Sequence, residues 1–314
     1  MAAGRARALQ VIDPVLTSVA RQFKSQGLVY DRLCPRIQVQ NESGLYPVYT
    51  KDFWFTNDPD NKKADRDETK EIHIEYSTES YLVDEYAYKV SISDRERANS
   101  LSALRYESSL VNNLMLRQAL AREKRLADLL RETTDGDLSS GAAPSTNWND
   151  DAATIETDIV VAKEAIYDLT GMTPNTIVLP WKVANAVAKQ ADIREVLKYT
   201  VNGQQIISTG EGILPAQLWG LQVIVPMGLR NTANPDGGTF SGAEIWGDDV
   251  RVLHVDSNAG WGIPSVAYAF QTKGPTVARW RENDPDVEYI RVKEIVDEKV
   301  VAPDLGYVIQ DVLS

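Results

Sequence analysis

The sequence predicts an elongated α+β protein, and three observations carry this prediction. Apolar and polar residues alternate over residues 46–55 and again over 72–92, with the period of a β-strand. Residues 93–134 are rich in Leu, Ala, Arg and Glu and contain no proline or glycine, which indicates a long helix. From residue 250 onward, short alternating segments separated by turn formers predict an antiparallel sheet.

Composition narrows the class of protein before any element is placed. The chain has 314 residues, of which 43% are hydrophobic, enough for a sizeable buried core. The formal net charge of -12 argues against a protein that coats nucleic acid by neutralising phosphates. Residues 1–36 nevertheless hold six basic and two acidic side chains, so this segment either faces a different surface or is a solvated basic arm.

The cysteine content and the lengths of the apolar runs indicate the compartment in which the protein is made. The single Cys34 excludes an intramolecular disulfide and any CxxC site, which favours a reducing compartment. Asp13 and Pro14 interrupt the first apolar stretch before it reaches signal-peptide length. No uncharged apolar run approaches the ~18 residues that span a bilayer. We therefore expect a soluble protein that is intracellular when made and has no membrane partner.

The N-terminal segment is predicted to contain one short amphipathic helix. Asp13 and Pro14 read as its N-cap and first residue, and Gly27 ends it. Residues 28–39 are broken by Pro35 and lack a regular apolar pattern, so we interpret them as an extended arm.

Residues 46–92 are predicted to form a long two-armed loop. Between its strands, residues 58–71 are almost all charged or turn-forming and predict a solvated tip. A hairpin cannot bury the aromatic residues beside this tip, so they need a partner surface in this chain or in a neighbour. Our candidate interface residues are Phe53, Trp54, Phe55, Tyr81 and Tyr86.

The predicted helix 93–134 begins with a capping box formed by Ser93 and Glu96. Its length of about 60 Å exceeds the diameter of about 50 Å expected for a compact chain of this size. The poor helix formers in residues 108–113 mark the place where a break is conceivable. A basic stripe of Arg117, Lys124 and Arg131 is either a solvated face or a surface toward packaged nucleic acid or an acidic neighbour.

The remainder of the chain divides into an α/β part and a final sheet. The α/β part has predicted helices at 152–169 and 181–190 and buried strands at 176–179 and 221–225. The final sheet has predicted strands at 250–255, 265–271, 276–281 and 287–296, with turns at 273–275 and 283–286.

No constellation of residues indicates catalysis or cofactor binding. His73 and His254 are far apart, and Cys34 lacks activating neighbours and is predicted to be a small apolar filler. Phosphate-binding loops are absent, and the acidic pairs lack the spacing of a calcium loop. We therefore expect no catalytic, metal or cofactor site; the enzymatic alternative is a carboxylate-dependent hydrolase using Asp248, Asp249 and His254.

The order of parts resembles the Hong Kong 97 fold of tailed-phage major capsid proteins. Four stretches are also similar to members of that family: LVYDRLCPRIQV (28–39), YKVSISDRERAN (88–99), IWGDDV (245–250) and GYVIQDV (306–312). The resemblance covers nearly the whole chain, although each motif is a loose pattern.

The resemblance implies a division into the parts of that fold. Residues 1–45 would be an N-terminal arm and 46–92 the extended loop. Residues 93–150 and 250–299 would form the peripheral domain with its spine helix, and 151–249 with 300–314 the axial domain.

The resemblance also implies a function without enzymatic activity. Subunits would assemble into hexamers and pentamers of an icosahedral head shell that encloses double-stranded DNA, and the shell would mature by expansion. Expected partners are other copies of the chain, a separate scaffolding protein, a portal, a possible decoration protein and DNA held by non-specific contact. The protein would be located in the virion capsid after assembly in the host cytoplasm. An encapsulin-type nanocompartment shell is the alternative with the same fold.

Overall fold

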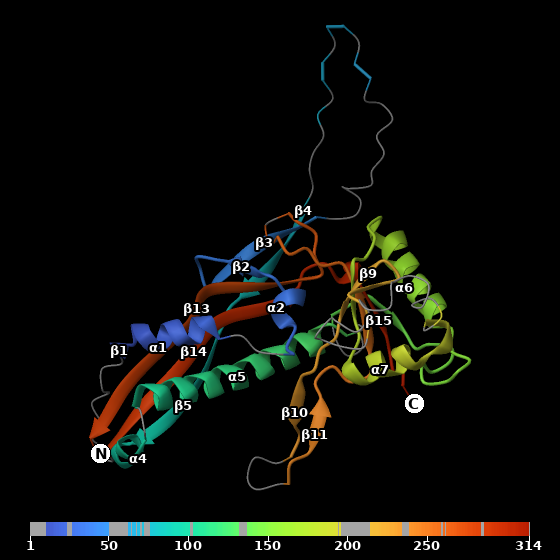
Figure 1. Cartoon of the computed structure of the whole chain (residues 1–314). Helices are drawn as coiled ribbons and strands as arrows, with labels where there is room; N and C mark the ends of the chain where they lie inside the picture. The colour runs from blue at the N-terminus through green and yellow to red at the C-terminus, as the bar shows by residue number, and fades with distance from the viewer. Residues whose placement is uncertain are drawn as a thin grey trace, which may run out of the picture.

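The computed structural model describes most of the chain in an elongated arrangement (Figure 1). The described residues are 11–23, 27–49, 76–100, 103–131, 137–193, 214–233, 239–258, 262–283 and 286–313, with residues 195 and 260 and seven residues between 62 and 71. The helices are α1 (Pro14–Gln22), α2 (Tyr30–Leu33), α4 (Asp94–Asn99), α5 (Ala103–Leu129), α6 (Ile155–Thr170), α7 (Trp181–Lys189) and the 3-10 helix η1 (Pro303–Leu305). None of the described helices is long and apolar enough to cross a membrane.

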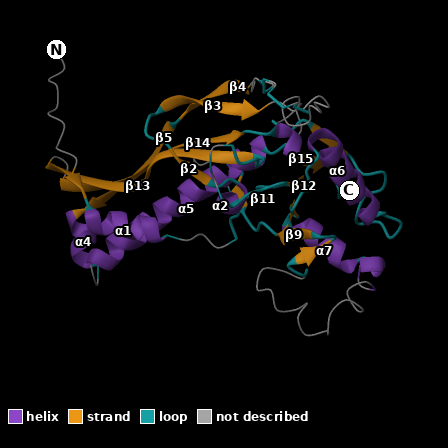
Figure 2. Ribbon diagram, turned by 90° about the horizontal axis from the view of Figure 1, so that it is seen from above, coloured by secondary structure: helices purple, strands orange, loops and turns teal. Residues whose placement is uncertain are grey.

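One half of the molecule is built around a long antiparallel hairpin. Its strands β13 (Ala267–Asn283) and β14 (Asp286–Val300) pair from Ala267 opposite Val300 to Asn283 opposite Asp286. Strands β1 (Val11–Ile12) and β2 (Arg36–Gln38) pair with β13, and β5 (Asp84–Ser93) pairs with β14. Helices α1 and α5 lie along one face of this sheet, and the ribbon of β3 (Ser43–Tyr49) and β4 (Tyr76–Leu82) lies on the other side (Figure 2).

The other half is built on a mixed six-stranded sheet with the order β6-β15-β12-β7-β9-β8. Its strands are β6 (Ser140–Ala142), β7 (Thr176–Val178), β8 (Gln217–Leu218), β9 (Leu221–Ile224), β12 (Val250–Leu253) and β15 (Gly306–Ile309). Helices α6 and α7 bury their apolar faces with this sheet in one core. A small hairpin of β10 (Leu229–Asn231) and β11 (Gly242–Glu244) projects from this half (Figure 1).

Several sequence predictions are confirmed. Asp13 caps α1 by accepting hydrogen bonds from the backbone N–H groups of Val15 and Leu16 at 2.9 and 3.1 Å. The Ser93–Glu96 capping box is present at the start of α4. Helix α6 ends at Gly171, whose φ of 66° suits a residue without a side chain. The predicted α/β part and the antiparallel final sheet are both observed.

The prediction of one continuous helix over residues 93–134 is wrong. Helix α4 ends at Ser100, whose backbone is extended (φ -77°, ψ 139°), and α5 begins at Ala103. The poor helix formers at 108–113 lie inside α5 without breaking it. Helix α5 is therefore about 40 Å long by the rise per residue, and the long hairpin β13–β14 runs beside it.

Residues 28–39 do not form an extended arm. They contain α2 and β2, and Leu33 and Cys34 are buried at 0% and 1% exposure. These side chains pack in the central core between α5 and the long hairpin. Cys34 is thus the apolar filler that the sequence predicted, and burial raises the pKa of its thiol.

The predicted turn at residues 273–275 is also wrong. Strand β13 runs through this segment, and the register against β14 shifts between Gln271 and Lys273 and again between Lys273 and Thr276. The Lys-Gly-Pro sequence therefore makes bulges, because an irregular ladder tolerates a proline that cannot donate a hydrogen bond. The turn at 283–286 is confirmed by the pairing of Asn283 with Asp286.

The two-armed loop starts from a regular ribbon of β3 (Ser43–Tyr49) and β4 (Tyr76–Leu82). The described residues between 62 and 71 are all exposed, as expected for a solvated tip. They stand apart from the body of the molecule in Figure 1. Phe53, Trp54, Phe55 and His73 lie outside the described residues.

Candidate assembly surfaces

The hydrolase hypothesis fails on geometry. Asp249 precedes β12 and His254 follows it, so these residues lie at opposite ends of one extended strand, about 15 Å apart along the chain. His254 instead places Nδ1 2.9 Å from the carbonyl oxygen of Thr173. A carboxylate and an imidazole at opposite ends of a strand cannot act on one bond.

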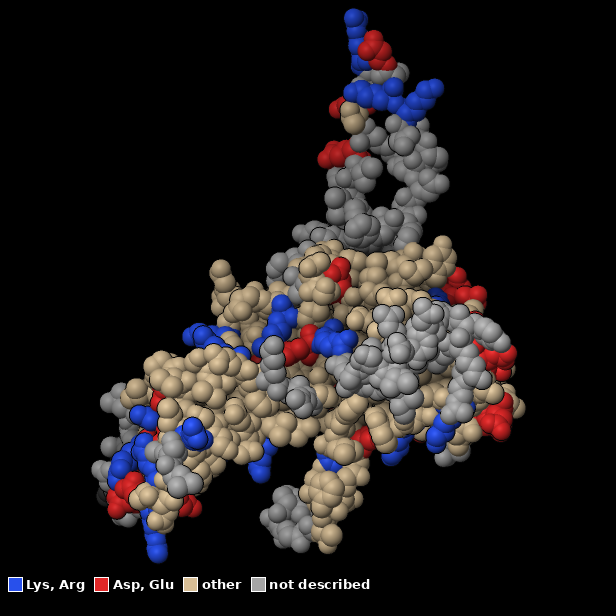
Figure 3. All heavy atoms as spheres, in the orientation of Figure 1, with Lys and Arg blue, Asp and Glu red and all other residues tan. Residues whose placement is uncertain are grey.

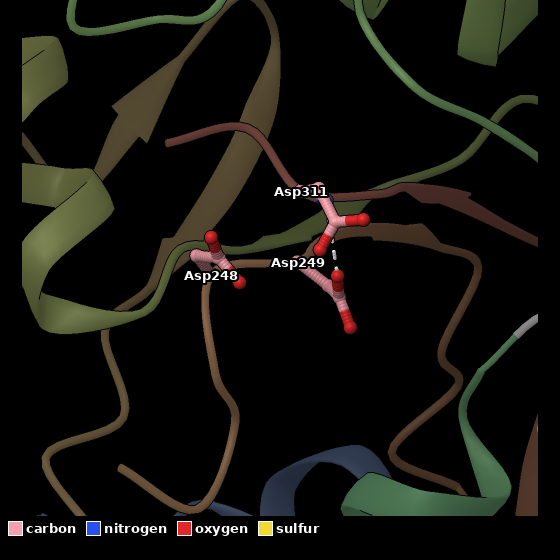
Figure 4. Close-up of side chains that lie close together, drawn as sticks. All are labelled: Asp248, Asp249 and Asp311. Atoms are coloured by element: carbon pink, nitrogen blue, oxygen red, sulfur yellow. Dashed lines mark hydrogen bonds between the residues drawn. The ribbon is translucent and has the colours of Figure 1, made fainter. Parts of the chain in front are cut away.

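Three carboxylates do meet at the other end of β12, those of Asp248, Asp249 and Asp311, with ligand atoms within 4.8 Å of one another (Figure 4). Asp249 accepts a hydrogen bond from the backbone N–H of Asp311 at 3.2 Å. Its other oxygen lies 3.4 Å from Arg251 and 3.6 Å from Arg131. The two arginines supply the positive charge that a cation would otherwise provide, and the cluster holds the C-terminal segment against β12.

The predicted interface aromatics that are described pack within their own subunit. Tyr81 is 7% exposed and stacks on Phe270, with ring centroids 4.9 Å apart. Tyr86 is half-buried, and the guanidinium of Arg125 lies 3.7 Å from its ring centroid. A role for these five aromatics between subunits stays a prediction.

Two members of the predicted basic stripe, Arg117 and Lys124, lie on α5, whereas Arg131 follows its end, and the stripe is largely paired. Lys124 forms an ion pair with Asp128, and Arg131 lies near Asp249. Arg117 is exposed. In the view of Figure 3, charges of both signs are interspersed and no broad basic face is seen. Contact of the stripe with DNA stays a prediction that now depends mainly on Arg117.

Exposed apolar side chains that the sequence reasoning did not single out include residues of the β3–β4 ribbon and of α6. On the β3–β4 ribbon, Leu45 and Leu82 are 66% and 63% exposed and lie on the face opposite Tyr46 and Tyr81. We call this pair the ribbon patch. The sequence could have indicated this patch, because neighbours along a strand point to opposite faces and Leu45 is next to the buried Tyr46.

The second group lies on α6. Ile155, Ile159, Ala162 and Ile166 form its buried face. Val160, Val161 and Tyr167 are 42%, 49% and 55% exposed on the opposite side, and we call them the α6 patch. Residues 160 and 167 are seven apart and share one stripe of the helix. A helix with apolar residues on both faces has a second surface to cover.

A largely buried charge network connects α5 to the long hairpin. Arg125 of α5 donates two hydrogen bonds of 3.0 Å to Glu298 of β14. Arg122 lies 2.9 Å from Glu298 and 3.4 Å from Glu294, and its side chain is 2% exposed. Because breaking one partner of a buried pair leaves an uncompensated charge, this network fixes the helix on the hairpin.

Comparison with known proteins gives matches along nearly the full chain, although no family model matches. Two relatives are major capsid proteins. That of Burkholderia phage BcepMu is 24% identical, over 98% of this chain and 99% of its own, and that of Pseudomonas phage JBD67 is 22% identical, over 96% and 97%.

Solved structures also match nearly the full length of the chain. A phage-related protein from Bordetella bronchiseptica RB50 superposes with a TM-score of 0.73 at 23% identity, over 97% of this chain and 98% of that one. The mature capsid of bacteriophage PhiM1 superposes with a TM-score of 0.54 at 12% identity, over 91% and 87%.

These structural matches show that the chain has the Hong Kong 97 fold, which confirms the fold expected from the order of parts. Over nearly its full length the chain is also similar in sequence to the major capsid proteins of these two phages, in agreement with the family resemblance of its motifs. Both relatives are structural proteins by name, which agrees with the expected function without enzymatic activity.

Proposed function

We propose that this chain is a tailed-phage major capsid protein that assembles as hexamers and pentamers into an icosahedral head shell around double-stranded DNA. The observation that supports this most is the pair of apolar patches on two different elements, the ribbon patch and the α6 patch. Different surfaces on one subunit suit head-to-tail contacts, which close into rings, and rings close into a shell. Many modest interfaces then reinforce one another.

The remaining partners follow from this proposal. A separate scaffolding protein would guide assembly in the host cytoplasm, a portal would occupy one vertex, and a decoration protein is a possible addition. The packaged DNA would be held by non-specific contact, since the chain carries a net charge of -12 and a strongly basic inner wall would hold the genome too tightly during packaging. Arg117 is the exposed member of the basic stripe available for such contact.

The experiment is electron microscopy of the full chain expressed with a scaffold, with Leu45→Asp/Leu82→Asp as the test variant. We expect wild-type protein to form closed shells and the variant to remain as folded, unassembled subunits, because a charge cannot be buried unpaired in an apolar contact. Leu104→Asp changes a 56% exposed leucine on α5 and serves as the matched control that still assembles.

Three outcomes would contradict the proposal. Persistent wild-type monomers with scaffold present would oppose shell formation, and normal shells from the double variant would remove the ribbon patch from the interface. Shells that enclose protein cargo in place of DNA would instead support the nanocompartment alternative. The triple change Phe53→Ser, Trp54→Ser and Phe55→Ser extends the same assay to the loop tip.

A further inference from the structure

Helices α6 and α7 pack on the six-stranded sheet in one core and approach each other at one end only. The first turn of α6 and the residues that follow α7 line a single cavity, which includes Glu156 and Gln190. The C-terminal part of α6 and the start of α7 lie away from this cavity. In Figure 1, α7 lies at the lower edge of this half beside the β10–β11 hairpin, and α6 lies at the right-hand edge. Surfaces on these two edges cannot cover each other within one subunit.

The start of α7 exposes an aromatic and a basic side chain next to the hairpin. Trp181 is 49% exposed, and the side chain of Lys182 is 65% exposed. Lys182 Nζ lies 3.8 Å from Glu244 of β11, which places the hairpin beside this end of the helix. Leu229 pairs with Glu244 across the hairpin, shares its face and is 55% exposed. We call Trp181, Lys182 and Leu229 the α7 patch.

The charge around the α7 patch is positive. The exposed charged side chains of α7 and of the two hairpin strands are all basic, namely Lys182, Lys189 and Arg230. Arg230 takes part in no ion pair among the described residues. The acidic Glu244 is half-buried, and Lys182 is exposed enough to reach a second carboxylate. A partner of the α7 patch should therefore combine apolar side chains with acidic ones.

The α6 patch of Val160, Val161 and Tyr167 has this composition. The exposed charged side chains of α6 are all acidic, namely Glu156, Glu164 and Asp168. Glu164 follows Val160 by four residues and precedes Tyr167 by three, so it lies on the same stripe of the helix. In Figure 3, acidic side chains lie along the right edge of this half and basic ones along its lower edge.

We propose that the α7 patch of one subunit packs on the α6 patch of a second copy, with Lys182 facing Glu164. This inference rests on the proposed function and specifies one head-to-tail contact within it. Trp181 and Leu229 cover the apolar side chains of the α6 patch, and the opposite charges select the partner and the register. Because every subunit carries one patch of each kind on a different edge, the same contact repeats around a ring.

The test is a charge exchange in the full chain, expressed with a scaffold. Lys182→Glu alone and Glu164→Lys alone each place like charges together, so each should raise the critical concentration for shell assembly at least about tenfold. Both substitutions in one chain restore opposite charges at every contact and should return that concentration to within about twofold of wild type. Lys189→Glu makes the same charge change near the other end of α7 and should leave it unchanged. Sedimentation velocity measures assembly, and circular dichroism verifies that each variant is folded.

The outcomes separate this contact from the proposed function. Wild-type protein that never forms shells would contradict the proposed function itself. Wild-type shells together with normal assembly of either single variant would overturn the contact alone, as would equal impairment by Lys182→Glu and Lys189→Glu. Single variants that fail without recovery in the combined variant would also overturn it, and would leave the α7 patch to another partner such as the scaffolding protein.

Discussion

Glu123 is the residue at which α5, the N-terminal segment and the loop before β12 are joined. Its fully buried carboxylate accepts hydrogen bonds from the backbone N–H groups of Val29 and Tyr30, at 3.0 and 2.8 Å, and from the indole of Trp246 at 2.6 Å. Burial raises the pKa of Glu123, and these hydrogen bonds oppose that rise. The donors account for the acidic side chain in an otherwise apolar region.

Replacing Glu123 by Gln should lower the free energy of unfolding by about 2 kcal/mol, because the new amide turns N–H groups toward donors that then lack an acceptor. Urea denaturation measures the change. Glu164→Gln, at an exposed position of α6, should stay within about 0.5 kcal/mol of wild type. Equal changes in the free energy of unfolding from the two substitutions would show that the hydrogen bonds of the Glu123 carboxylate do not stabilise the fold.

The phenol of Tyr30 makes the free energy of unfolding depend on pH in the alkaline range. Burial, followed by the nearby charge of Asp31, raises the pKa of its phenol to about 12. Because the phenol ionises more readily in the unfolded chain, its contribution to stability is complete below about pH 10 and is lost as the pH rises toward 12.

Between pH 9 and pH 12, the free energy of unfolding of Tyr30→Phe should therefore fall by about 2 kcal/mol less than that of wild type. Denaturant unfolding at stepped pH values is the measurement. Parallel profiles for Tyr30→Phe and wild type would contradict the assigned pKa.

At the scale of elements, signals carried by a few adjacent residues were readable from the sequence. The Asp13 cap and the Ser93–Glu96 box both act within one helical turn, and both are present. The break at Ser100 was missed because no glycine or proline marks it. The bulges in β13 were read as a turn, because Lys-Gly-Pro has the composition of a turn and only the pairing with β14 makes it a strand.

Gly44 and Gly274 allow a paired test of two strands. A Cβ added at Gly44 would lie 2.5 Å from the hydroxyl and 2.7 Å from Cζ of Tyr81, its cross-strand neighbour, whereas one at Gly274 would meet nothing within 4 Å. Gly44→Ala should therefore displace Tyr81 from Phe270 and cost about 1–3 kcal/mol. Gly274→Ala should change stability by less than about 1 kcal/mol.

Thermal unfolding and near-ultraviolet circular dichroism of both glycine variants measure these effects. The aromatic dichroism should change in Gly44→Ala alone, because only there does a stacked tyrosine move. An unchanged spectrum with full stability in Gly44→Ala would mean that Tyr81 finds another rotamer without loss.

At the scale of the whole molecule, the central core joins residues that no local pattern connects. Leu33, Leu126, Trp246 and Val308 belong to one cluster although they span most of the chain. This explains why residues 28–39 were misread as an arm: their apolar partners lie in segments that become neighbours only in the fold. The α6 patch, in contrast, is encoded in one helix and was within reach of a periodicity argument.

The α6 patch provides the last test of the molecule as a shell component. Val160→Asp/Tyr167→Asp places two charges on one exposed stripe, so the subunit should fold with unchanged thermal stability but fail to form shells. Val160→Leu/Tyr167→Phe keeps the stripe apolar and should assemble normally. Sedimentation velocity and electron microscopy separate assembled from unassembled protein. Shells formed equally by both double variants would place α6 on a free surface of the particle and leave the ribbon patch to hold the subunits together.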